Sequence, residues 1–79
     1  MEHIKKGTVV LVTAGKEKNS IFIVVEELSP DRVLIADGRH RKLSRPKQKN
    51  VKHLKALGEL GCLPERDRLI WNSLSSFRG

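Results

Sequence analysis

Three short segments rich in valine and isoleucine follow one another in the first half of the chain, with only a few residues between them. They are residues 8–14 (TVVLVTA), 20–28 (SIFIVVEEL) and 32–37 (RVLIAD). β-Branched residues favour strands, and the residues between the segments favour turns. A parallel crossover needs about a dozen residues or more, so connections this short allow only antiparallel neighbours. The sequence therefore predicts an antiparallel meander.

Both faces of these expected strands are apolar, whereas a half-exposed strand alternates apolar and polar side chains. In the first segment, Val10 and Val12 would lie on one face and Val9 and Leu11 on the other. A sheet that curls into a small barrel buries its inner face, and its outer face then needs another element packed on it. We therefore expect a small antiparallel barrel with a covering element.

The C-terminal segment is the candidate for that covering element. Pro64 suits a first helical position, and Arg78 with Gly79 forms a helix stop signal. At about 100° per residue, one stripe of the helix collects apolar side chains, with Leu69 pointing away from it. The stripe consists of Leu63, Ile70, Leu74 and Phe77, with Trp71 at its flank. We expect this α-helix to pack on the barrel, with Trp71 in the core or at its edge.

The middle of the chain is less regular. Asp37-Gly38 is a dipeptide typical of tight hairpins, so we expect the chain to return as a strand from residue 39. Pro46 predicts a loop over residues 44–49, and residues 50–57 read as a last strand or turn. The whole chain, residues 1–79, is expected to form a single domain with the barrel over 1–57 and the loop and helix over 58–79.

Residues 39–53 (RHRKLSRPKQKNVKH) contain seven Lys or Arg and no acid, which equals the entire net charge of +7. We call them the basic segment. Segregated charge of this kind attracts a polyanion and contributes little to folding. A solvated or disordered run is the plain alternative. However, the segment lies between apolar stretches without a linker, so its cations are expected in a fixed geometry suited to a phosphate backbone.

No set of residues points to catalysis, a metal or a cofactor. The histidines His3, His40 and His53 are scattered among cations, and Glu26 and Glu27 would point to opposite faces of a strand. We therefore expect a binding protein and not an enzyme.

Other features bear on the compartment. The single cysteine, Cys62, excludes a disulfide within one chain and is expected to be a small buried residue. No stretch approaches the roughly 18 apolar residues of a membrane span, and MEHIKKGTVV lacks the apolar region of a signal peptide. We expect a cytoplasmic protein that is monomeric when free and has no membrane among its partners.

The region around residues 13–18 (TAGKEK), preceded by Lys6-Gly7 and VVLV, resembles the KOW motif of ribosomal and transcription-factor proteins. A later stretch of the sequence, VLIADGRHRKLSRPKQKNVKHL, is similar to short bacterial KOW-domain RNA-binding proteins related to the L-fourteen-e type of large-subunit ribosomal protein. The match covers residues 3–57 approximately, and the ADGRHRKLSRPKQKNVKHL stretch carries most of its specificity.

This resemblance implies an SH3-like barrel of the KOW type that contacts ribosomal or other structured RNA, with the ribosome or its proteins as further partners. Gly15 matches the turn glycine, Asn19 stands where a second glycine is usual and tolerates positive φ, and Gly38 serves the later turn. The matched cations are Lys16, Lys18, Arg39, Arg41, Lys42, Arg45, Lys47, Lys49 and Lys52. His40 and His53 lie among them and complete the expected RNA-binding set.

Two alternatives compete with an RNA-binding module: an SH3-like adapter for peptides, and a non-specific binder of polyanions such as DNA or an acidic membrane. The chain has no tyrosine, two phenylalanines and one tryptophan, which is few for a proline-rich peptide groove or for stacking a single strand. Structured RNA is therefore favoured, with arginine planes available to stack on an unpaired base. Only the family resemblance separates RNA from DNA.

Overall fold

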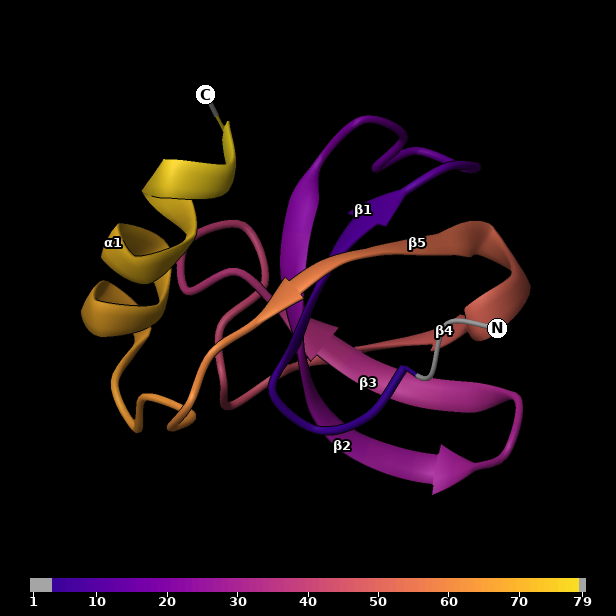
Figure 1. Ribbon diagram of the computed structural model, residues 1–79, viewed down its shortest axis with the longest axis horizontal. Helices are drawn as coiled ribbons and strands as arrows, with labels where there is room; N and C mark the ends of the chain where they lie inside the picture. The colour runs from indigo at the N-terminus through magenta and orange to yellow at the C-terminus, as the bar shows by residue number, and fades with distance from the viewer. Residues whose placement is uncertain (1–3, 79) are drawn as a thin grey trace.

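The computed structural model describes residues 4–78, in which one C-terminal helix packs on a five-stranded antiparallel sheet (Figure 1). The strands are β1 (Thr8–Val12), β2 (Ile21–Ser29), β3 (Arg32–Ala36), β4 (Lys47–Asn50) and β5 (Leu54–Glu59). A 3₁₀ turn, η1 (Val51–His53), separates β4 from β5, and the helix is α1 (Asp67–Arg78). The expected meander and the mainly β class are confirmed. His3 and Gly79 lie outside the described residues.

The sheet has the order β4-β3-β2-β1-β5 and curls around its inner face, but it is not closed. Register shifts lie between Val9 and Val10 in the β1–β5 pair and between Val24 and Glu26 in the β2–β3 pair. Bulges of this kind bend a strand and increase its twist. The two edge strands β4 and β5 are joined by η1 but do not pair with each other, so the barrel expected from the sequence is open between them.

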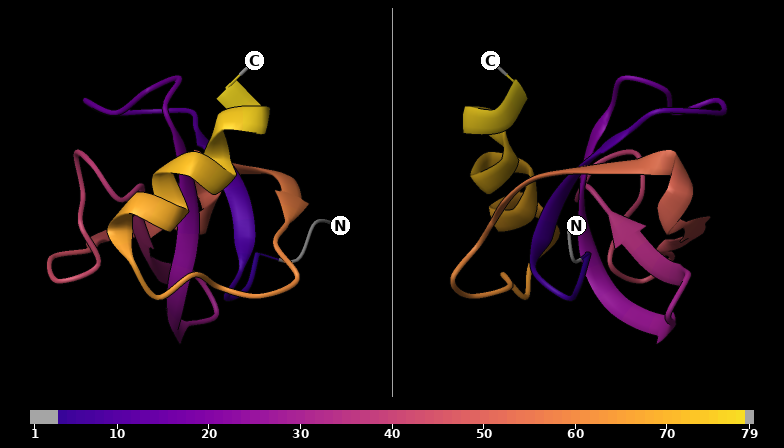
Figure 2. Two further views of the ribbon diagram at one scale, coloured as in Figure 1. Left: turned by 90° about the vertical axis from the view of Figure 1, so that its left-hand side faces the viewer. Right: turned by 45° about the vertical axis from the view of Figure 1, so that its right-hand side comes forward.

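The two faces of the sheet are buried in two separate apolar clusters. The inner cluster is enclosed by the curl and contains Val10, Val12, Phe22, Val24, Val33, Ile35 and Leu54. The outer cluster lies under α1 and contains Val9, Ile23, Ile70 and Leu74. Figure 2 (left) looks onto α1, which crosses β1 and β2. The expectation that both faces are apolar and that the C-terminal helix covers one of them is confirmed.

The helix begins later than its sequence signals suggested. It starts at Asp67 and not near Pro64, although Leu63 still packs against the outer cluster. The start is fixed by tertiary contact, because the Asp67 carboxylate accepts a hydrogen bond from the Leu43 backbone N–H at 2.7 Å. The residues from 60 to 66 are used to reach that point from β5. In this connection Cys62 is exposed, so the expectation that it is buried was wrong.

The expected return strand from residue 39 was also wrong, and residues 37–46 form a loop, which we call the basic loop. The chain returns as β4, so half of the loop expected over residues 44–49 is a strand. Pro46 lies just before β4, where its missing N–H costs no ladder hydrogen bond. The strand expected over 50–57 is divided between η1 and β5, which runs to Glu59.

No helix in the described part of the chain is long and apolar enough to cross a membrane.

The burial of α1 predicts the effect of two matched leucine substitutions. Leu74 is fully buried in the outer cluster, whereas Leu69 is 51% exposed on the same helix. Leu74→Ala should lower the free energy of unfolding by about 2–5 kcal/mol because it leaves a cavity. Leu69→Ala should change it by less than about 0.5 kcal/mol. Denaturant unfolding of both variants checks this; equal small effects would mean that α1 contributes little to the fold.

Candidate nucleic-acid interface

The basic loop is organised by one buried carboxylate, that of Asp37, which is only 2% exposed. Its Oδ1 atom accepts hydrogen bonds from the backbone N–H groups of Arg39 at 2.9 Å and Arg41 at 2.8 Å. Its Oδ2 atom lies 3.0 Å from Nδ1 of His40. A side chain that bonds to the backbone two residues on stabilises a turn in place of a β-ladder. This explains why the chain forms a loop here and turns basic side chains to the surface.

The charge of Asp37 is maintained by the same contacts. Burial by itself raises the pKa of the carboxyl, but the hydrogen bonds from the Arg41 and Arg39 amides and from His40 outweigh it. The net result is a pKa below the ordinary value of 3.8. Asp37 therefore stays ionised at neutral pH, inside a loop that is otherwise cationic.

Gly38 is required for close packing between the basic loop and the helix. Its φ is 81°, and a Cβ at this position would overlap the carbonyl group of Asp67. Together with the Leu43–Asp67 hydrogen bond, this contact fixes the loop against the start of α1. Gly38 has positive φ, as a turn glycine should, but it lies in a loop and not in the expected tight hairpin, and its contact with the helix is an additional reason for glycine.

Trp71 of α1 also contacts the basic loop. The Arg39 guanidinium lies 5.1 Å from the centre of its ring, and the His40 ring meets it edge-on at 5.8 Å. The Arg78 guanidinium lies 3.7 Å from the ring centre and donates a hydrogen bond to the Trp71 carbonyl oxygen at 2.7 Å. Cations over an indole face are held by its quadrupole. Trp71 is thus half-buried and positions two arginines, but it is not among the residues that pack on either apolar cluster, where the sequence led us to expect it.

The residues from 13 to 20, which we call the first turn, have the backbone conformation that the sequence led us to expect. Gly15 has φ of 92° and Asn19 has φ of 75°, so Asn19 does adopt the left-handed region. The Asn19 N–H donates to the Val12 carbonyl oxygen at 2.8 Å and closes the turn. Lys16 and Lys18 are exposed, and no contact of their ammonium groups occurs within residues 4–78.

The first turn lies against the basic segment through Glu17 and Lys49. The Glu17 Oε1 atom lies 2.6 Å from Nζ of Lys47 and 3.6 Å from Nη2 of Arg41. Lys49 donates from Nζ to the Ala14 carbonyl oxygen at 3.1 Å. Figure 2 (left) shows the first turn and the basic loop projecting to the same side. Two segments separated in the sequence therefore form one surface.

Glu17 changes the charge that this surface presents. The hydrogen bond from Lys47 lowers the pKa of Glu17 below 4.5, although partial burial opposes the shift. The basic segment contains no acid in its sequence, yet the fold places an ionised carboxylate beside it. Lys47, Lys49 and Arg41 are thus partly engaged within the protein.

The remaining expected site residues lie around this centre. Lys42 and Arg45 are exposed in the basic loop and, in the described range, make no side-chain hydrogen bond or ion pair. They line a shallow pocket of about 290 Å³ together with Arg39, His40, Arg41 and Ser44. Lys52 and His53 lie in η1, where the His53 carbonyl oxygen accepts a hydrogen bond from the Thr13 N–H at 2.8 Å. The expected cations therefore lie in the first turn, the basic loop, β4 and η1, and the first turn contacts the other three through Glu17, Ala14 and Thr13.

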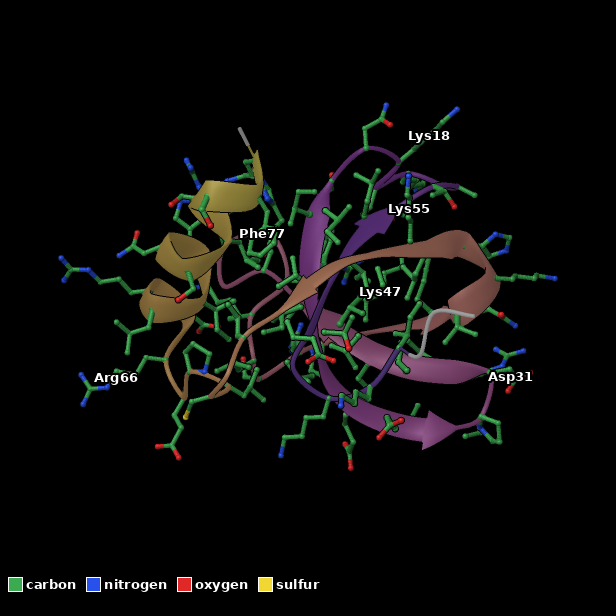
Figure 3. All side chains as sticks on the ribbon, in the orientation of Figure 1. Lys18, Asp31, Lys47, Lys55, Arg66 and Phe77 are labelled. Carbon is green, nitrogen blue, oxygen red and sulfur yellow. The ribbon has the colours of Figure 1, made fainter. Side chains whose placement is uncertain are left out.

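Sequence reasoning missed two residues of this region. Asp37 was treated only as part of a hairpin dipeptide, although an Asp before a cationic run is itself a signal for a side-chain-anchored turn. Lys55 lies opposite Leu11 at the end of β1, next to the first turn. Figure 3 shows Lys55 and Lys18 at the same end of the molecule, away from Asp31 and Arg66. The run without acidic residues extends past Lys55 to Gly58, so a basic segment defined by that whole run would have included Lys55.

The lowered pKa of Asp37 predicts how acid affects stability. An ionised Asp37 stabilises the folded state fully above its unfolded pKa near 3.8, and this contribution is lost as pH falls through the lower folded value. Asp37→Asn should therefore cost about 1–2 kcal/mol at pH 7, because charge-assisted hydrogen bonds become neutral ones. The difference in the free energy of unfolding between the unmodified protein and Asp37→Asn should be smaller at about pH 3 than at pH 7.

Urea unfolding at both pH values measures this difference, with Asp31→Asn as the control at an exposed carboxylate. A cost that is the same at both pH values would show that the charge of Asp37 does not stabilise the basic loop.

Comparison with known proteins adds no assignment to this geometry: no protein-family model matches the sequence, and the search of curated proteins finds no match.

Proposed function

We propose that this chain is a non-catalytic RNA-binding domain with an SH3-like fold of the KOW type, which contacts the phosphate backbone of structured, ribosomal RNA. The observation that carries the proposal is the meeting of the first turn and the basic segment on one surface, joined by the contact between Glu17 and Lys47. A turn and a cationic loop held in a fixed geometry suit a shaped polyanion better than a flexible one. A ribosomal target places the protein in the cytoplasm.

The exposed cations provide the chemistry for this contact. Lys16, Lys18, Lys42 and Arg45 are exposed around the surface and have no ion pair within the part of the chain that the structure describes. The pocket of about 290 Å³ gathers guanidinium and ammonium groups around a space that an anion can enter. Arginine binds phosphate oxygens in a bidentate manner, and lysine binds them as a point charge. Together they hold the RNA backbone without reading its sequence.

The aromatic residues favour RNA over a peptide adapter. Phe22 is 1% exposed in the inner cluster, and Phe77 packs on the outer cluster. Trp71 is engaged by two arginines and a histidine. Proline-rich peptides dock in grooves lined by several aromatic side chains, whereas Trp71 and Phe77 are the only phenylalanine, tyrosine or tryptophan side chains that the described residues offer near the basic loop. Phosphate and 2′-hydroxyl contacts to folded RNA need no such groove.

The salt dependence of binding tests the proposed surface. We expect log affinity for an RNA hairpin to fall against log salt with a slope of about −3 to −5, at about 0.7–0.9 per neutralised phosphate. Lys42→Gln with Arg45→Gln should flatten the slope by about 1.5, since two exposed cations are removed. Fluorescence anisotropy over a salt series measures the slope.

The control is Lys5→Gln with Lys6→Gln, which removes the same charge just before β1, at the end of this strand away from the first turn, and includes Lys5, whose Nζ lies 3.5 Å from Oε1 of Glu59. Its slope should remain that of the unmodified protein. If both pairs of substitutions flatten the slope equally, or if RNA, DNA duplex and heparin lose affinity equally, the non-specific polyanion binder is the better description.

The position of Glu17 generates a separate expectation. Because it neutralises part of the charge of Lys47 and Arg41, Glu17→Gln should tighten RNA binding severalfold and steepen the salt slope by about 1. Glu26→Gln removes the same charge at an exposed residue in the second half of β2, away from the first turn, and should have a smaller effect on RNA affinity and on the salt slope. Anisotropy titrations of the two variants decide; equal gains would mean that Glu17 acts only through net charge.

A further inference from the structure

The structure contains a larger pocket that the proposed backbone contacts do not use. It has a volume of about 560 Å³ and lies between the C-terminal half of α1 and the outer face of the sheet; we call it the side pocket. Leu11, Ile21, Leu57 and Phe77 line its apolar part. Leu11 and Ile21 are register partners in β1 and β2, beyond the pair Val9 and Ile23 that α1 covers.

The remaining walls of the side pocket are planar or polar. Trp71, His40 and Arg78 line it, and the Arg78 guanidinium lies over the Trp71 ring. Figure 3 shows Phe77 on the side of α1 that faces the sheet. The pocket therefore combines an apolar floor with a wall that presents the Arg78 guanidinium plane, on which a flat ring can stack.

The side pocket opens between the two parts of the proposed RNA surface. Asn19 and Ser20 of the first turn line one side, and Asp37 and His40 of the basic loop line another. The Asp37 carboxylate is occupied by two backbone amides and His40, whereas Arg78 and the neighbouring Arg39 carry positive charge. An apolar cavity with a cationic border complements a flat ring attached to a phosphate.

We propose that the side pocket receives one unpaired base of the bound RNA, turned out of a bulge or loop, while the flanking phosphates lie on the surrounding cations. Unpaired bases in RNA commonly stack on aromatic side chains or on arginine guanidinium planes. The volume of about 560 Å³ lies within the range of about 300–1,000 Å³ found for small-ligand sites. This inference rests on the proposed function and adds selectivity for RNA with an unpaired nucleotide.

The single tryptophan of the chain gives a direct readout of the pocket. A hairpin with one bulged nucleotide should bind about tenfold more tightly than the same hairpin fully paired, because stacking of a base on an aromatic or arginine plane adds affinity of that order. The bulged hairpin should also change the fluorescence of Trp71, whereas the paired hairpin should change it little.

Two matched variants separate the pocket from the charged surface. Leu57 is 38% exposed and lines the pocket, while Leu69 is 51% exposed on the helix and does not line it. Leu57→Asp should abolish the preference for the bulged hairpin, whereas Leu69→Asp, with the same change of charge, should retain it. Lys42→Gln with Arg45→Gln should weaken both hairpins equally and leave their ratio unchanged.

The outcomes distinguish the two proposals. Tight binding of both hairpins with equal affinity, and no response of Trp71, would overturn the base pocket and leave the RNA-binding surface standing. A response of Trp71 to a proline-rich peptide but not to the bulged hairpin would assign the pocket to a protein partner. If neither hairpin binds at low salt, the proposed function and the base pocket are both overturned.

Discussion

The structure depends on one constraint, which is that a very small sheet must bury both of its faces. β1 and β2 place alternate side chains in the inner and outer clusters, so Val9 and Val10 are both fully buried although they point in opposite directions. The curl of the sheet accounts for the inner face, and only α1 accounts for the outer one. With so few residues available for a core, the helix is part of the minimum that holds the fold together.

This constraint also decides where charge can lie. Strands that are apolar on both faces leave little room for cations, so the basic residues gather in the first turn, in the basic loop and at the sheet edge. The basic loop is in turn fixed to the helix through Asp67 and Gly38. The helix that completes the hydrophobic core thereby also orients the charged surface.

Local pattern predicted the strands and the apolar stripe of the helix, because both follow from the alternation and spacing of side chains. Prediction from local pattern failed where a contact between residues distant in the sequence determines the backbone conformation. The helix start depends on the hydrogen bond between Leu43 and Asp67, which lie far apart in the sequence, and the basic loop depends on the burial of Asp37. In the candidate site, the sequence identified most of the cations, apart from Lys55, but it did not identify Glu17, whose role appears only when the first turn meets β4.

The open seam between β4 and β5 has a further consequence, which concerns self-association. An unpaired strand edge can template the addition of a strand from another copy of the chain, and proteins commonly block such edges with lysine. β4, an edge strand, has the sequence KQKN and carries Lys47 and Lys49, whose repulsion between two copies opposes pairing of their edges. The cations that we propose to contact RNA therefore also oppose edge-to-edge pairing at the seam, and we expect their replacement by apolar residues to reduce solubility.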